Sequence, residues 1–350
     1  MKKIIYTLLT GFMLLSCEKT IDFKEEITDP LLVVSSFITP DSTIKAHVSL
    51  SKFFLYDDDN YYNSFKSVDN AEFSFSVNGI EKGKLIALGN GYYQSNYKPA
   101  VGEQIKIDVK SNGYTTVFST AEIPGKPSII QVDTTTSIEK YYDYYTVYDQ
   151  ENNLTYDTVG ETTRKKIYFK IKFKDNGEQK DYYRFVVLKR SYSTKQPTYG
   201  GGTIDVEEYL LNEVYLTHFD DIIFGNQTNN TNGWFDDSSS SEYSFDTFSD
   251  DFINGKEYNL TFSDYLNRDY TGYDDAYGYS FIDVTRAEYH IYLQSISSDY
   301  YLYSKSYAAA NSVEDNPFTE PVQIHSNIKN GIGIFGSYTS SDVWMIKVKN

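Results

Sequence analysis

Three Asn-Gly pairs between short apolar runs constrain the fold of this chain more than any other feature of its sequence. The pairs are Asn78-Gly79, Asn90-Gly91 and Asn112-Gly113. Asn-Gly accepts the positive φ angles of the tight turns that join antiparallel strands, and it is the strongest short signal for a β-hairpin. The surrounding runs predict strands at Leu31–Ile38, Ile44–Leu55, Ala71–Val77, Tyr92–Tyr97, Gln104–Val109 and Tyr114–Ala121. We therefore predict an immunoglobulin-like antiparallel β-sandwich over residues 31–123.

A second, larger β region is expected after this sandwich. Pro124-Gly125-Lys126-Pro127 interrupts the strand pattern and predicts a domain boundary. From Lys166 to Phe173 apolar residues alternate with lysines on most of the other positions, which is typical of a strand with one solvated face. Stretches rich in glycine, asparagine and serine predict long polar loops between such strands. The expected fold class is mainly β, with the sandwich followed by an antiparallel sandwich-like or barrel-like domain over residues 128–350.

One segment of this second region has helical spacing. Apolar residues recur at intervals of three and four residues, at Tyr300, Tyr303, Tyr307 and Ala310. Serines precede the first of them, and serine is a favoured N-cap. The pattern predicts one short helix near residues 298–311 that packs on the sheet.

The first residues have the form of a secretory signal. Lys2 and Lys3 precede an apolar run that ends at Leu15, shorter than the about 20 residues that span a bilayer. The run ends in Leu14-Leu15-Ser16-Cys17, which resembles the bacterial lipobox, in which the cysteine is acylated. We expect a signal peptide at residues 1–16, lipidation of Cys17 and a lipidated tether at residues 17–30. The alternative is that Cys17 is an ordinary residue near an ordinary cleavage site.

Charge and cysteine content exclude several kinds of partner and chemistry. The net charge is −17, and it becomes −19 when removal of residues 1–16 takes away Lys2 and Lys3. Such a charge argues against a nucleic-acid partner, because nucleic-acid affinity depends on lysine and arginine at phosphates. It also opposes adsorption to anionic lipid, so attachment to a membrane would depend on acyl chains. Cys17 is the single cysteine, so once it is lipidated there is no disulfide or thiolate site.

No stretch of the sequence has the pattern of a catalytic or metal site. The four histidines, His47, His218, His290 and His325, do not have metal-ligand spacing, and the acidic clusters lack the spacing of a dedicated calcium loop. The motifs of serine hydrolases, of phosphate loops and of dinucleotide sites are missing from the sequence. We therefore expect no metal, no cofactor and no catalytic residues. A surface hydrolase of glycan or peptide stays open, because facing carboxylates cannot be identified from sequence.

Tyrosine is the unusual component of the composition, with 35 residues in 350. Aromatic residues suit the half-buried surface of a sheet, so a structural role is the first explanation. Tyrosine also offers a rigid ring with a polar tip, which suits a surface that stacks on a sugar, peptide or protein. Two dense clusters supply the candidate ligand- or partner-binding residues: Tyr142, Tyr144, Tyr145, Tyr270, Tyr273 and Tyr277.

Both ends of the mature chain resemble a family of uncharacterised Bacteroidetes lipoproteins, domain-of-unknown-function family 4249. The closing residues that carry the resemblance are Asn316-Pro317-Phe318-Thr319-Glu320-Pro321-Val322, Ser326-Asn327-Ile328 and Asn330-Gly331-Ile332-Gly333-Ile334-Phe335-Gly336. The opening residues are Leu31-Leu32-Val33-Val34 and Ile38-Thr39-Pro40-Asp41-Ser42. The resemblance implies an envelope lipoprotein associated with TonB-dependent outer-membrane receptors. It supplies no catalytic residues.

These observations lead to one expected function and two alternatives. We expect a lipid-anchored protein on the outer membrane, at the cell surface, of a Bacteroidetes-type bacterium. Its expected role is that of a non-catalytic accessory or ligand-binding partner of a TonB-dependent barrel protein, with a glycan or peptide as its possible ligand. The first alternative is a structural or assembly component of an outer-membrane complex, and the second is the surface hydrolase.

Overall fold

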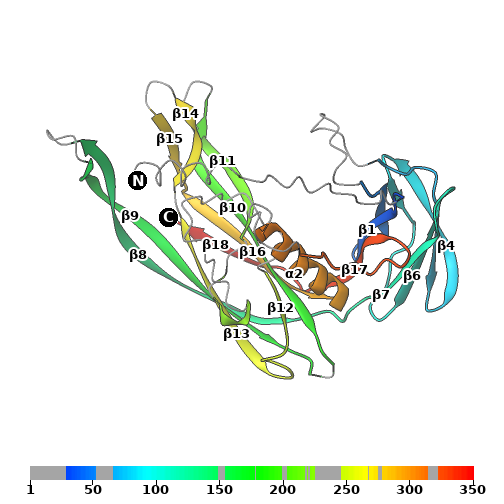
Figure 1. Ribbon diagram of the computed structural model, residues 1–350. Helices are drawn as coiled ribbons and strands as arrows, with labels where there is room; N and C mark the ends of the chain where they lie inside the picture. The colour runs from blue at the N-terminus through cyan, green and yellow to red at the C-terminus, as the bar shows by residue number, and fades with distance from the viewer. Residues whose placement is uncertain are drawn as a thin grey trace, which may run out of the picture. The chain divides into compact units, whose positions relative to one another are not determined.

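The computed structural model shows a mainly β protein with one α-helix in its described part, which confirms the expected fold class (Figure 1). It describes residues 29–52, 66–148, 154–177, 179–198, 203–216, 219, 221–224, 246–266, 268–274, 278–313 and 322–350. For residues 141–148, 154–162, 268–274, 278–281 and 312–313 the description covers the backbone alone. Within these ranges, no helix is long and apolar enough to cross a membrane.

Seven strands near the N-terminus form a β-sandwich. The strands are β1 (Leu32–Ile38), β2 (Lys45–Leu50), β3 (Glu72–Val77), β4 (Ile80–Gly89), β5 (Tyr92–Gln94), β6 (Gln104–Lys110) and β7 (Val117–Glu122). The first half of β4 pairs with β3, and its second half pairs with β5. The first sheet contains β1, β2 and β5, and the second contains β3, β6 and β7. Strand β4 belongs to both sheets and therefore forms one margin of the sandwich. Between the sheets lies a core that includes Phe73, Phe75 and Ile107.

The Asn-Gly pairs form the turns that the sequence predicts. Asn78 and Gly79 connect β3 to β4 with φ angles of 50° and 80°. Asn90 and Gly91 connect β4 to β5 with φ angles of 52° and 76°. Two consecutive positive φ angles are the signature of the type I′ turn, whose twist matches that of the flanking strands.

A strand from the C-terminal end completes the first sheet of the sandwich. Strand β17 (Ile332–Ser340) pairs in parallel with β1, from Val33 opposite Ile332 to Ile38 opposite Ser337. Gly333 has a φ of 118°, and a Cβ atom there would lie 2.0 Å from the carbonyl oxygen of Val34. A glycine is required at this position because the two backbones approach so closely.

The second region is built from two facing sheets. A three-stranded sheet has the order β13 (Glu257–Leu266), β9 (Leu154–Lys174) and β8 (Ile129–Tyr148). It packs on a larger sheet that contains β11 (Thr203–Leu216), β10 (Tyr182–Pro197), β16 (Arg286–Ile296), β12 (Thr247–Ser249) and β18 (Trp344–Lys349). A separate hairpin joins β14 (Arg268–Asp274) to β15 (Gly278–Asp283). Phe169 of β9 and Phe262 of β13 stack in the core, with ring centroids 4.4 Å apart.

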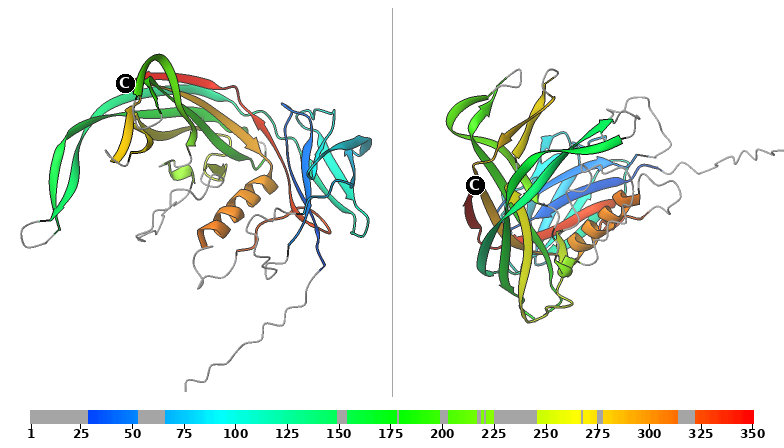
Figure 2. Two further views of the ribbon diagram at one scale, coloured as in Figure 1. Left: turned by 90° about the horizontal axis from the view of Figure 1, so that it is seen from above. Right: turned by 90° about the vertical axis from the view of Figure 1, so that its left-hand side faces the viewer.

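The helix α2 (Ser298–Val313) begins where the serine-led pattern predicts it (orange in Figure 2). The Oγ atom of Ser297 accepts a hydrogen bond from the backbone N–H of Tyr300 at 3.4 Å, so this serine is the N-cap. The Tyr300 ring packs on Phe37 of β1 at a centroid distance of 4.5 Å. The helix therefore packs on the sheet, as expected.

Candidate functional site

The outward face of the three-stranded sheet combines aromatic, hydroxyl and charged side chains. Along β9, Ile167, Phe169 and Ile171 are buried in the core. The residues between them, Tyr168 and Lys170, point to the opposite face, because side chains alternate along a strand. Residues that oppose each other on neighbouring strands share a face, so the pairing of the strands identifies the whole outward surface.

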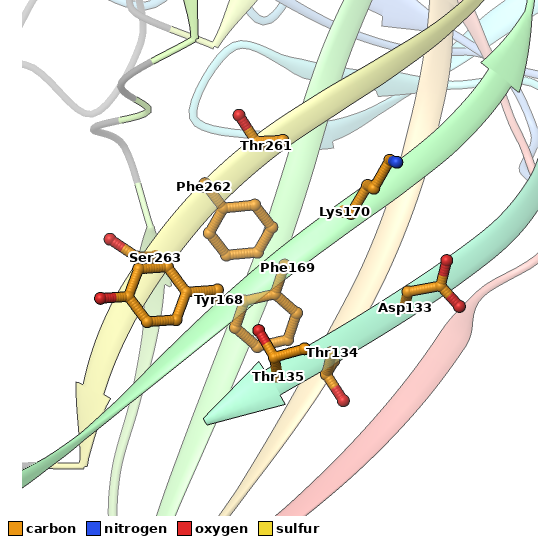
Figure 3. A pocket seen from close by; sticks show the side chains of 9 residues that line it. All are labelled: Asp133, Thr134, Thr135, Tyr168, Phe169, Lys170, Thr261, Phe262 and Ser263. Atoms are coloured by element: carbon orange, nitrogen blue, oxygen red, sulfur yellow. The ribbon is translucent and has the colours of Figure 1, made fainter. Parts of the chain in front are cut away.

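Two rows of outward side chains border a groove of about 350 Å³ on this face (Figure 3). One row is Asp133, Lys170 and Thr261, and the other is Thr135, Tyr168 and Ser263. Each row takes one residue from each of β8, β9 and β13. Between the rows, Thr134, Phe169 and Phe262 also line the groove. The site is therefore an open, cross-strand groove with hydrogen-bonding groups along both sides.

Beside the groove, four side chains form what we call the tyrosine platform: Glu139, Lys166, Tyr168 and Tyr265. The hydroxyl groups of Tyr168 and Tyr265 donate to the two carboxylate oxygens of Glu139 at 3.2 Å and 3.0 Å. Lys166 Nζ lies 5.3 Å from the centroid of the Tyr168 ring and 5.0 Å from that of Tyr265. These distances are within the range of cation–π attraction.

The geometry makes the ring of Tyr265 lie along the sheet. Glu139 is on β8 and Tyr265 is on β13, with β9 between them. Adjacent strands are about 4.8 Å apart, so the tyrosine side chain must extend across β9 to reach the carboxylate. The Tyr265 ring is half-buried, and the Lys166 ammonium group lies over it. Tyr168 is 40% exposed, so its ring is available for contact.

Lys166 of the platform is held in its charged form, and the neighbouring Ser137 has an unused hydroxyl group. The hydrogen bond with Tyr265, with a smaller contribution from the charge of Glu139, raises the pKa of Lys166. The lysine is therefore a cation at neutral pH. Ser137 lies opposite Lys166 on the same face. Its Oγ atom is buried, and no residue in the described part of the chain accepts from it or donates to it.

The side chains of this face are of the kinds that bind a sugar or a peptide. Aromatic ring faces stack on the apolar faces of sugars and on peptide side chains. The groove adds the carboxylate of Asp133, the ammonium group of Lys170 and the hydroxyl groups of Thr135 and Ser263. Among the described residues, no group of histidine, cysteine and carboxylate side chains is arranged to hold a metal ion.

A second cavity, of about 360 Å³, lies beside α2. Its lining residues are Phe37, Tyr300, Tyr303, Ser304 and Tyr307. A Cβ atom at Gly336 would lie 2.9 Å from the Phe37 ring, so the glycine keeps this wall in place. The Tyr300 hydroxyl group accepts a hydrogen bond from Arg184 at 3.3 Å. Its lining includes no charged side chain that could orient a ligand, whereas the groove has Asp133 and Lys170.

The residues that the sequence singles out are not brought together by the described backbone. Tyr142, Tyr144 and Tyr145 lie on β8, farther along the strand from the platform, whereas Tyr270 and Tyr273 lie on β14 of the separate hairpin. The described part of these five residues is their backbone, and Cys17 and Tyr277 lie outside the described residues. The binding roles of these tyrosines and the lipidation of Cys17 stay predictions.

Sequence reasoning missed Tyr168 and Tyr265, although one signal for Tyr168 was present. The alternating run from Lys166 to Phe173 indicates a solvated face, and Tyr168 is the aromatic residue among its lysines. A large aromatic residue on the polar face of an amphipathic strand has no core to fill. Tyr265 has no comparable signal, because its position becomes apparent only when β13 is paired with β9.

Comparison with known proteins identifies the family. Residues 18–342 match the model of a family described as domain of unknown function (DUF4249). The chain belongs to the DUF4249 family. The match covers both the sandwich and the tyrosine platform of this DUF4249 protein, and it supports the resemblance of the two chain ends. No curated protein and no solved structure matches the chain.

Proposed function

We propose that this DUF4249 protein is a surface lipoprotein that binds a glycan or peptide without transforming it, as an accessory of a TonB-dependent transporter. The tyrosine platform and its groove carry this proposal. They combine the exposed ring of Tyr168 and the half-buried ring of Tyr265 with acceptors and donors on a hydrogen-bonded sheet. A rigid aromatic surface loses little conformational entropy when a ligand binds to it.

The location in the proposal is supported by sequence. The charged start, the apolar run and the cysteine of the lipobox are the features of a lipidated envelope protein. The TonB-dependent partner and the Bacteroidetes setting are supported by the resemblance that the chain ends show. A lipid anchor and a binding face are together what an accessory of an outer-membrane transporter needs.

The proposal predicts that loss of the platform rings removes binding. In Tyr168→Ala/Tyr265→Ala, both stacking surfaces are lost, and we expect affinity for the recognised oligosaccharide or peptide to fall at least about tenfold, the loss of roughly 1.4 kcal/mol. Array screening of the purified chain identifies the ligand, and calorimetry measures its affinity. Tyr92→Ala is the matched control, since this tyrosine is 57% exposed on the sandwich.

The outcomes separate the proposal from its competitors. If Tyr168→Ala/Tyr265→Ala and Tyr92→Ala bind the ligand equally well, the platform is not the binding site. A captured ligand that is cleaved during the assay would favour a hydrolase. If the arrays show no ligand, but a barrel protein purifies with the chain, a structural or assembly component would be favoured.

A further inference from the structure

One edge of β8 is unpaired in the described part of the molecule. Strand β8 pairs with β9 on one side, and its pairing is regular from Gln131 opposite Lys172 to Asp143 opposite Gly160. No described residue pairs with its other side between Ile130 and Ile138. A strand edge of this kind presents a row of unpaired N–H and C=O groups to solvent.

The outer edges of β13, β7 and β11 are capped or charged. On β13, the N–H group of Thr261 donates to the carboxylate of Asp221 at 2.8 Å. On β7, Phe118 exchanges two backbone hydrogen bonds with Lys329. Strand β11 carries three glutamates and is interrupted by register shifts against β10. From Val132 to Ile138, β8 has one charged residue and no proline.

The surface beside this edge is incompletely covered. Thr134 and Thr136 oppose Phe169 and Ile167 and so share their inward face. Phe169 and Ile167 are 1% and 0% exposed, yet both threonines are exposed. Ile138 on the same face is 73% exposed. The larger sheet therefore covers β9 but ends before it covers β8.

The strand beneath this margin is β18. Lys165 of β9 donates from its Nζ atom to the carbonyl oxygen of Lys349 at 2.5 Å, which places the end of β18 next to this side of the three-stranded sheet. The inward residues of β18, Trp344, Ile346 and Val348, contact the core but stay half-buried. An added strand would cover these apolar side chains and pair with β8.

We propose that the edge of β8 from Ile130 to Ile138 accepts an extended strand from a partner protein by backbone hydrogen bonding. The occupant has apolar residues at alternate positions, facing Ile138 and the half-buried residues of β18. Its other side chains emerge beside Asp133, the charged residue of this edge, in a chain with a net charge of −17, so they are basic. Main-chain bonds supply affinity, and the alternate side chains supply specificity. This inference does not depend on the proposed function.

A peptide in which valine alternates with lysine is the probe. We expect it to bind the purified chain and to slow hydrogen exchange of the β8 amides, with no such protection on β13. A second peptide with the same side chains is N-methylated at alternate residues, so it loses half of its backbone donors. We expect at least about tenfold weaker binding of that peptide. Equal binding of both peptides, or protection confined to another strand, would overturn the inference.

A protein variant tests the same edge from the other side. Thr136→Lys places a charge on the exposed inward face, where it is tolerated in the free chain but opposes an incoming apolar side chain. Thr120→Lys makes the same change on the edge strand β7, and we expect it to bind the probe as the unmodified chain does. Thermal unfolding establishes that both variants are folded.

Two further results are informative. Unchanged binding by a folded Thr136→Lys variant would exclude this edge as the docking site. If the chain forms a concentration-dependent dimer that Thr136→Lys abolishes, the occupant is a second copy, and the assignment to a partner protein is wrong. Both measurements use the chain without any barrel protein, so their failure leaves the proposed function untouched.

Discussion

Buried tyrosines in this protein donate their hydroxyl groups to carboxylates. Tyr183 donates to Asp175 at 2.6 Å, and Tyr289 donates to Asp264 at 2.7 Å. Burial and the neighbouring carboxylate raise the pKa of both tyrosines. The rings fill the core, and each pairing satisfies a polar group that would otherwise destabilise the fold. This recurring pair accounts for part of the tyrosine-rich, acidic composition in structural terms.

Glu288 is the residue whose titration should contribute most clearly to acid stability. It is 8% exposed and accepts hydrogen bonds from Arg286 at 2.5 Å and Lys347 at 3.0 Å. Burial opposes ionisation, but the bonds from Lys347 and Arg286 outweigh it and lower the pKa of Glu288 to about 2. Because the folded-state pKa is below the unfolded-state value, the ionised form stabilises the fold above about pH 5.

Substitution of Glu288 should therefore lower the free energy of unfolding less at acidic pH than at neutral pH. We expect Glu288→Gln to lower the free energy of unfolding by about 3 kcal/mol at pH 7 and by about 1 kcal/mol at pH 3. The stabilisation disappears as the pH falls through 2. Urea titrations at the two pH values measure both differences, with the exposed Glu81→Gln as control. An equal loss at both pH values would contradict this assignment.

At the scale of elements, the parallel pairing of β1 and β17 holds together the two ends of the sequence. We expect Gly333→Ala to lower the free energy of unfolding by about 3 kcal/mol or more, because its Cβ atom would collide with the carbonyl group of Val34. Gly89→Ala is the control: its φ is 94° and no atom lies within 4 Å of the added Cβ. We expect about 1 kcal/mol there.

Chemical denaturation of the two variants measures the difference. A similar loss in both would mean that backbone strain, rather than the close approach of β1 and β17, determines the requirement for glycine. A larger loss in Gly333→Ala would show that the contact with Val34 contributes beyond strain.

Local patterns predicted the elements of this fold better than their pairing. Asn78-Gly79 and Asn90-Gly91 specify turns through their own φ angles, and the serine-led spacing after Ser297 specifies α2, so sequence is sufficient for these features. The pairing of β1 with β17 joins residues about 300 positions apart, and no local property of either strand encodes it. The division of β4 between two sheets is equally invisible in its sequence.

The candidate site follows the same rule. The alternation around Lys166 predicted a solvated face, and Tyr168 could have been read from it. The platform as a whole could not, because Glu139, Tyr168 and Tyr265 come from three strands and meet through cross-strand register. The tyrosine clusters chosen from local density lie on β8 and on the separate β14–β15 hairpin. Density along the chain is a poor guide to proximity in a sheet.

At the scale of the molecule, the proposed function requires a lipid anchor and a binding face. The family match from residue 18 to residue 342 includes every strand that builds the platform. The anchor would hold the chain at the outer membrane, and the platform would present a ligand or dock to a barrel. A partner that depends on the platform should therefore be lost when its rings are removed.

The most direct test is a pull-down from native membranes in mild detergent, with the chain tagged at its C-terminus and mass spectrometry of the bound proteins. We predict a stoichiometric TonB-dependent barrel protein with the unmodified chain. If the Tyr168→Ala/Tyr265→Ala variant retains this partner, the platform serves ligand binding. If the variant loses the partner, the platform serves docking to the barrel protein. Recovery of the unmodified chain alone would contradict the accessory role.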